Sequence, residues 1–177
     1  MIRQATIDDL STIVHLCERV KIQIRKENIH LWGDDYPNQE IFQYDIENNL
    51  GWVLIQNNKT VGYIAVSYDI DEDFEHLEDH EAEETFKKRL LEECLIEKTE
   101  YCSFHRLMID PAYQRQHLAS FFLQIIEQTI NKNYFALFTS PDNHKAIALY
   151  QKAGYEIRST YSFPYGNMLL MTKKVSL

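Results

Sequence analysis

Apolar and polar residues recur along the chain with two periods, and the changes of period mark the predicted secondary structure. Apolar positions three and four residues apart predict amphipathic helices, whereas short alternating or continuous apolar runs predict strands. The helical spacing covers Thr6–Ile24, Asn38–Asn49, Leu118–Ile130 and Asn143–Ala153. The strand pattern covers Ile2–Ala5, Trp52–Gln56, Thr60–Tyr68, Tyr101–Ile109, Tyr134–Ser140, Tyr155–Ser162 and Asn167–Lys174. Strands and helices alternate without strict βαβ regularity, so we expect a mixed sheet with helices on both faces.

Polar residues at the ends of these segments support their boundaries. Thr6, with Asp9 three positions later, is the pattern of a capped helix start, and Asn38 is a favourable cap for the second helix. Asn57-Asn58-Lys59 tolerates left-handed backbone and predicts a hairpin turn. Asn28–Pro37 breaks the helical spacing and mixes aromatic residues with carboxylates, which predicts a loop that could line a pocket.

The segment Tyr101–Ile130 is the most informative part of the chain. Asp110-Pro111 ends its strand, because proline lacks the N–H that a ladder needs. A short polar loop, Ala112–Gln116, then leads directly into a helix. Such a helix start presents free N–H groups at the positive end of the helix dipole. The segment therefore predicts an anion site that could hold a phosphate-bearing ligand.

Composition and charge limit the classes of protein that fit this pattern. The chain has 177 residues and 45% hydrophobic content, enough for one compact core, so we expect a single domain over residues 1–177. The net charge of −9 is local, because an insert at about 69–100 holds 14 of the 27 acidic residues and 4 of the 18 Lys and Arg. The second half of this insert has helical spacing. With no basic stripe or basic amphipathic helix, neither nucleic acid nor a membrane is an expected partner.

Cysteine usage and the first residues of the chain predict a cytoplasmic protein. Cys17, Cys94 and Cys102 lack metal-ligand spacing and fall in apolar patterns, which favours buried free thiols in a reducing compartment. MIRQATIDDL has neither a basic n-region nor an apolar h-region, and no apolar run approaches the length of a membrane span.

Two motifs together carry a family resemblance. Gln114-Arg115-Gln116-His117-Leu118-Ala119 resembles the pyrophosphate loop of GNAT superfamily N-acetyltransferases, whose pattern is Gln or Arg, two residues, Gly, one residue, then Gly or Ala. Asn143–Tyr155 resembles that family's other hallmark, an Asn, Ala, Tyr and Gly followed by an aromatic residue. The resemblance implies an α/β (α+β) fold with a mixed, mostly antiparallel six- to seven-stranded sheet. It also implies acetyl transfer from acetyl-CoA to a primary amine of a small molecule or peptide, by direct attack and without a metal.

The same resemblance implies a set of cofactor-binding residues. The main chain of Leu107, Met108 and Ile109 would bind the pantetheine arm and carbonyl, and Tyr150 matches the general acid that protonates the departing thiolate. The implied cofactor-binding positions are Leu107, Met108, Ile109, Gln114, Arg115, Gln116, His117, Leu118, Ala119, Ser120, Asn143, Ala146 and Tyr150. The alternative interpretation is that Tyr150 is only a core aromatic residue on an amphipathic helix.

His117 stands where the family pattern has its first glycine. A glycine lets the phosphate approach the backbone without an intervening side chain. The histidine must therefore either point outward or donate its own ring N–H to the phosphates. We expect the backbone mode of binding, and thus that His117→Gly keeps or improves CoA affinity.

The general base and the acceptor pocket are less defined. In the similar family, a glutamate on this strand often serves as the general base. The matching position here is Ser103, and a serine cannot act as that base. His105 has the same strand parity and a suitable unperturbed pKa near 6.5, so it is a candidate base. Water relayed to Asp34, Asp35 or the acidic insert is an alternative. Arg106, of opposite parity, is expected to pair with a buried carboxylate. The predicted substrate-binding residues are Trp32, Asp35, Tyr36 and Tyr165.

Several alternatives remain open at this stage. The chain could be a noncatalytic acyl-CoA-binding sensor or interaction module, or a phosphoribosyl or nucleotide binder that uses the same helix start. His76 and His80 have a metal-compatible spacing, but no third ligand is evident, and we expect no metal site. The acidic insert could steer cationic amines or be only a solvated surface. A homodimer is compatible with the sequence.

Overall fold

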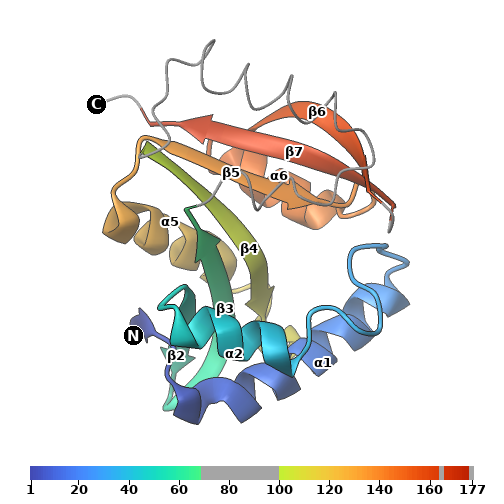
Figure 1. Ribbon diagram of the computed structural model, residues 1–177. Coiled ribbons are helices and arrows are strands. Elements are labelled where there is room, and N and C mark those ends of the chain that lie inside the picture. The colour runs from blue at the N-terminus through green and yellow to red at the C-terminus, as the bar shows by residue number, and fades with distance from the viewer. Residues whose placement is uncertain (69–99, 164–165, 176–177) are drawn as a thin grey trace. The chain divides into compact units, whose positions relative to one another are not determined.

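The computed structural model describes residues 1–68, 100–163 and 166–175 (Figure 1). Its strands are β1 (Ile2–Gln4), β2 (Gly51–Gln56), β3 (Lys59–Ser67), β4 (Tyr101–Ile109), β5 (Tyr134–Thr139), β6 (Glu156–Phe163) and β7 (Gly166–Lys174). Its helices are α1 (Leu10–Lys26), α2 (Gln39–Glu47), α5 (Leu118–Ile130) and α6 (His144–Lys152), with short 3-10 turns η1 (Ile7–Asp9) and η3 (Pro111–Tyr113). The helices and strands predicted within these ranges are all present. The acidic insert, except Glu100, and Tyr165 lie outside the described residues.

The strands form one seven-stranded sheet in the order β1-β2-β3-β4-β5-β7-β6. The pairs β1–β2, β2–β3, β5–β7 and β6–β7 are antiparallel, whereas β4 and β5 are parallel. The predicted fold class, a mixed and mostly antiparallel sheet with flanking helices, is therefore confirmed.

The chain's contacts gather into two compact units. The first unit consists of Met1–Val66 and His105–Thr129, and the second of the described residues within Ser67–Phe104 and Ile130–Leu177. Strand β4 contributes its first half to the second unit and its second half to the first. The assignment of residues 1–177 to one acetyltransferase-like domain stays a prediction.

The core of the first unit forms because α1 and α2 bury their apolar faces on alternate residues of β2 and β3 (Figure 1). The helices contribute, among others, Ile13, Leu16, Cys17 and Phe42, and the strands contribute Val53, Tyr63, Ala65 and Met108. Residues of the opposite parity are buried as well, and α5 buries Phe122, Leu123 and Ile126. The sheet of this unit is thus covered on both faces.

The predicted caps and the hairpin turn are confirmed in the first unit. The Asp9 carboxylate accepts hydrogen bonds from the Thr6 N–H at 2.8 Å and the Thr6 hydroxyl at 3.0 Å. The Asn38 side chain accepts a bond from the Ile41 N–H at 3.0 Å. Asn57 and Asn58 have φ of 52° and 59°, which is the left-handed backbone expected of the turn between β2 and β3.

The second unit is built around β5, β7 and β6, which run side by side in Figure 1. Phe104 stacks on Phe135 with ring centroids 5.3 Å apart, and Phe138 packs edge-on against Phe163 at 5.4 Å. Cys102 in this unit and Cys17 in the first are buried free thiols, as predicted, while Cys94 lies outside the described residues. No helix in the described ranges is both long and apolar enough to cross a membrane.

Candidate functional site

Strand β4 changes character midway along its length. Its parallel ladder with β5 joins Tyr101–Phe104 to Tyr134–Leu137 and extends no further in the described residues. Two residues later Arg106 has a φ of 54°, which interrupts the regular strand. The main chain of Leu107, Met108 and Ile109 follows this interruption, and Met108 and Ile109 turn their side chains into the protein. The side chain of Leu107 is half-buried.

A buried polar network holds the interruption in place. Arg106 donates from Nη2 to Asp45 Oδ1 at 2.7 Å and from Nε to Asp45 Oδ2 at 3.2 Å. The Tyr63 hydroxyl also donates to Asp45, at 2.6 Å. Burial, and then the negative charge of Asp45, raise the pKa of Tyr63, so that the phenol stays a neutral donor. The prediction that Arg106 pairs with a buried carboxylate is confirmed.

The predicted substrate loop, Asn28–Pro37, is fastened to its surroundings at several points. The buried Lys21 amine donates to the carbonyl oxygens of Asp34 at 3.0 Å and Pro37 at 2.9 Å. The Arg25 guanidinium pairs with the Asp34 carboxylate. Arg106 donates from Nη1 to the Tyr36 hydroxyl at 2.8 Å. These contacts fix the loop to α1 and β4 within the first unit, and so favour a preformed surface.

The loop's candidate side chains divide by exposure. Asp35 and Tyr36 are exposed and could meet an acceptor directly. Trp32 is half-buried and packs against the core cluster of the first unit. Tyr165, the fourth predicted acceptor residue, lies outside the described residues.

A 3-10 turn, η3, and a short loop connect the end of β4 to the start of α5. The Asp110 carboxylate accepts hydrogen bonds from the Ala112 N–H at 3.0 Å and from Arg19 Nη2 at 2.7 Å, which fixes η3. Beyond η3, the side chains of Gln114–His117 are exposed. The chain then enters α5 at Leu118.

The first turn of α5 supplies the predicted anion-binding groups. The His117 carbonyl accepts the Phe121 N–H at 3.1 Å and the Ser120 hydroxyl at 2.8 Å, so His117 caps the helix through its own backbone. The N–H groups of Leu118, Ala119 and Ser120 therefore precede the first intrahelical hydrogen bond. Within the described ranges, no hydrogen bond involving these three N–H groups is present. Three adjacent donors at the positive end of a helix suit a phosphate group.

His117 departs from the glycine pattern in sequence but not in conformation. Its φ is 58°, in the left-handed region that glycine enters at little cost. Arg115, two residues earlier, has a φ of 62°. The glycine of the family pattern is thus explained by a backbone requirement as well as by space for the phosphate. Sequence reasoning recognised only the second of these.

The candidate base, His105, lies in β4 and is half-buried, directly before the Arg106 interruption. Ser103, at the position where the family often has a glutamate, is buried. Because Arg106 breaks the regular alternation, strand parity alone does not fix the direction of later side chains. His105 remains a candidate base.

The second motif forms α6 and its two ends. The Asn143 side chain accepts a bond from the Ala146 N–H at 3.2 Å and so caps the helix. At the other end Gly154 has a φ of 94°, and the Tyr155 N–H donates to the Tyr150 carbonyl at 2.9 Å. The Asn and Gly of the motif therefore have helix-ending roles whether or not a ligand is bound.

Tyr150 is buried on α6, with its ring 5.9 Å from that of Tyr155. Burial raises the pKa of its phenol, so the hydroxyl stays protonated across the physiological range. Within residues 1–68, 100–163 and 166–175, its hydroxyl has no hydrogen-bond partner. The group is thus suited to donate a proton or hydrogen bond to a ligand.

Sequence reasoning missed two residues that organise the site, Lys21 and Asp45. Both are charged residues on otherwise apolar helix faces, since Lys21 lies four residues after Cys17 and Asp45 three after Phe42. This placement is a usable signal, because a charge on a buried face needs a partner. The residues next to Lys21 and Asp45 in the sequence do not show which groups these two side chains bind.

Among the described residues, no group of three or more His, Cys, Asp or Glu side chains is arranged to hold a metal ion.

The comparisons with known proteins agree with this geometry. Residues 18–155 match the model of the acetyltransferase (GNAT) family. A GNAT-family acetyltransferase from Streptococcus agalactiae 2603 has a TM-score of 0.82 at 24% identity, over 100% of this chain and 96% of its own. The ribosomal-protein-S18-alanine N-acetyltransferase of Escherichia coli has a TM-score of 0.66 at 17% identity, over 100% and 94%. The PaiA N-acetyltransferase of Thermoplasma acidophilum, in complex with coenzyme A, has a TM-score of 0.69 at 16% identity, over 99% and 98%. No curated protein matches the sequence.

Proposed function

Because this chain belongs to the GNAT acetyltransferase family, we propose that it transfers the acetyl group of acetyl-CoA to a primary amine of a small molecule or peptide. The observation that carries the proposal is the first turn of α5, where His117 has left-handed backbone and three N–H groups are free for a diphosphate. Such a site suits the diphosphate, the anionic part of coenzyme A.

In the proposed complex, the loop Gln114–Ser120 binds the diphosphate through its main chain. Leu107, Met108 and Ile109 bind the pantetheine arm and the thioester carbonyl through backbone groups after the Arg106 interruption. Asn143 and Ala146 are secondary cofactor contacts in this proposal, since their side-chain and N–H groups already bond each other at the start of α6.

The proposed reaction is direct attack on the thioester. The amine nitrogen forms a bond to the acetyl carbon, the C–S bond breaks, and the amine loses one proton while the thiolate gains one. Tyr150 donates to the thiolate, and its raised pKa keeps the proton in place until sulfur becomes negative. His105, or a water held by it, takes the proton from the amine.

The acceptor side of the proposal rests on the loop Asn28–Pro37. Asp35 presents a carboxylate that attracts a cationic amine, and Tyr36 presents a ring whose hydroxyl is held by Arg106. Trp32 and Tyr165 complete the proposed acceptor set. A structure of AAC(6')-Ib with paromomycin and acetyl-CoA has a TM-score of 0.67 at 17% identity, which supports a small polyamine as one class of acceptor to test.

The first test is a calorimetric titration with CoA and acetyl-CoA. We expect saturable one-to-one binding, followed by release of free thiol when a panel of primary amines is added with acetyl-CoA. Binding without turnover of any amine would favour a noncatalytic acyl-CoA sensor. Absence of binding would reject both functions. A cytoplasmic location and a homodimer stay predictions.

The loop gives a second test, His117→Gly. We expect CoA affinity to stay within about threefold of wild type and the free energy of unfolding to be unchanged or up to about 1 kcal/mol higher, because glycine accepts a φ of 58°. Calorimetry and urea denaturation measure the two quantities. His117→Ala is the matched control, because it removes the imidazole but keeps the strained backbone. If both variants lose more than about tenfold in affinity, the imidazole itself binds the diphosphate.

A further inference from the structure

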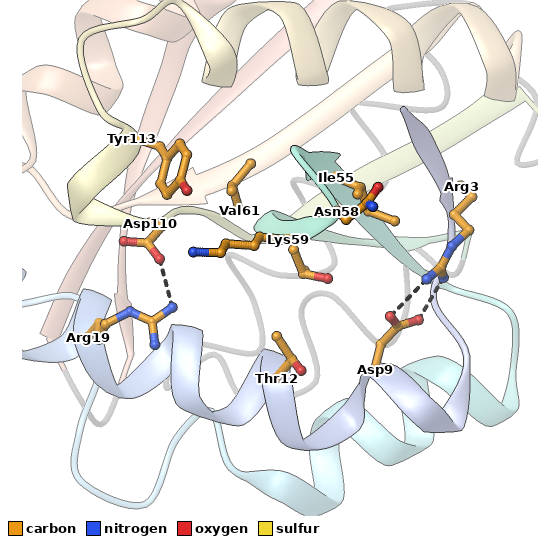
Figure 2. Close-up of a pocket in the computed structure, with 11 residues that line it drawn as sticks. Arg3, Asp9, Thr12, Arg19, Ile55, Asn58, Lys59, Val61, Asp110 and Tyr113 are labelled. Atoms are coloured by element: carbon orange, nitrogen blue, oxygen red, sulfur yellow. Dashed lines mark hydrogen bonds and ion pairs between the residues drawn. The ribbon is translucent and has the colours of Figure 1, made fainter.

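The first unit contains a cavity that the proposed acetyl transfer does not use. Its volume is about 600 Å³, within the usual range for a small-molecule site. Helix α1 forms one wall, with Thr12 and Arg19, and the turn between β2 and β3 forms another, with Asn58 and Lys59 (Figure 2). Asp110 and Tyr113 line one end, and Arg3 and Asp9 line the other.

Most of the charges in this cavity are already paired. Arg3 binds both Asp9 oxygens, at 2.6 and 2.9 Å, and Arg19 binds Asp110 at 2.7 Å. Each pair is neutral as a unit, which leaves Lys59 as the uncompensated charge among the ionised side chains that line the cavity. The lining therefore carries a net charge of about +1 at neutral pH.

The Lys59 side chain lies inside the cavity, where its charge can bind a ligand. Figure 2 shows its side chain extended along the cavity, with the amine directed toward the end where Arg19 and Asp110 meet. No described residue accepts a hydrogen bond from this amine. Arg19 donates one guanidinium N–H to Asp110, so its other guanidinium N–H groups can also donate to a ligand.

We propose that this cavity is a binding site for a small organic anion that carries a carboxylate or phosphate group. Lys59 and Arg19 bind the anionic group, the hydroxyls of Thr12 and Thr60 accept or donate at its polar atoms, and Ile55 with Val61 contacts its apolar part. The apolar body and the single net charge favour a monoanionic or singly anchored ligand over a polyanion such as nucleic acid.

The test uses two probes, inorganic phosphate and the monocarboxylate butyrate, added to the isotopically labelled full-length chain. Amide shifts of Thr60, Val61 and Tyr113 are followed by NMR. We expect saturable shifts with at least one probe, and affinity at least about tenfold weaker in Lys59→Gln. Lys26→Gln removes the same charge from an exposed site on α1 outside the cavity, and should bind like wild type.

The amides of Leu118, Ala119 and Ser120 distinguish this site from the proposed diphosphate loop. They should respond to phosphate equally in wild type and Lys59→Gln, whatever the outcome for coenzyme A. Equal probe affinity in Lys59→Gln and wild type, or no response at the cavity amides, would overturn the proposal. It would also be overturned if Lys59→Gln weakened CoA binding more than tenfold, because the cavity would then belong to the cofactor site.

Discussion

Asp45→Asn is expected to lower the free energy of unfolding by about 3–5 kcal/mol, because it leaves the Arg106 guanidinium buried without a counter-charge. The side chains of Asp45 and Arg106 are 2% and 12% exposed, so water cannot replace the lost carboxylate. An asparagine amide also turns one N–H donor toward Arg106 or Tyr63, both of which donate to Asp45 in the native protein. Urea denaturation followed by circular dichroism measures the change.

Two further variants test the explanation. Glu40→Gln makes the same change on the exposed face of α2, and should alter stability by less than about 1 kcal/mol. Asp45→Asn combined with Arg106→Met should be less destabilised than the sum of the single variants, because the unpaired cation is gone. Additive losses would contradict the idea that the two side chains act as a pair.

Local sequence signals predicted the elements of this fold for identifiable physical reasons. The turn at Asn57-Asn58 needs left-handed backbone, which asparagine tolerates, and the cap at Asn38 needs a short side-chain acceptor. Helix α5 carries apolar residues at helical spacing and buries Phe122, Leu123 and Ile126. Each of these requirements is met within a few residues, so the sequence expresses it directly.

The site was less predictable because its geometry depends on contacts between distant residues. Arg106 reaches across 61 positions to Asp45, and Arg19 across 91 to Asp110. The sequence suggested that Arg106 had a carboxylate partner but could not choose it from 27 acidic residues. The left-handed backbone of His117 was likewise not predicted, because only a few per cent of non-glycine residues have a positive φ, even though histidine is enriched among them.

Tyr150→Phe is the substitution from which we expect the largest loss of activity. If Tyr150 protonates the departing thiolate, kcat should fall by about 10²–10⁴, the usual contribution of a general acid. The affinity for CoA should stay within about twofold, because the variant keeps the ring that packs against Tyr155. Since burial raises the pKa of Tyr150 above its usual value of about 10, the wild-type rate should show no alkaline loss from this group up to about pH 10.

Tyr155→Phe is the matched control, because it removes a phenol hydroxyl from the neighbouring buried ring. We expect its kcat to stay within about threefold of wild type. Equal losses in both variants would point to packing rather than proton donation. If kcat is unchanged in Tyr150→Phe, Tyr150 has only a packing role in the core. A solvent molecule would then protonate the thiolate. Thiol release and calorimetric CoA binding must both be measured, because only a loss of rate at constant affinity identifies a role in the chemical step.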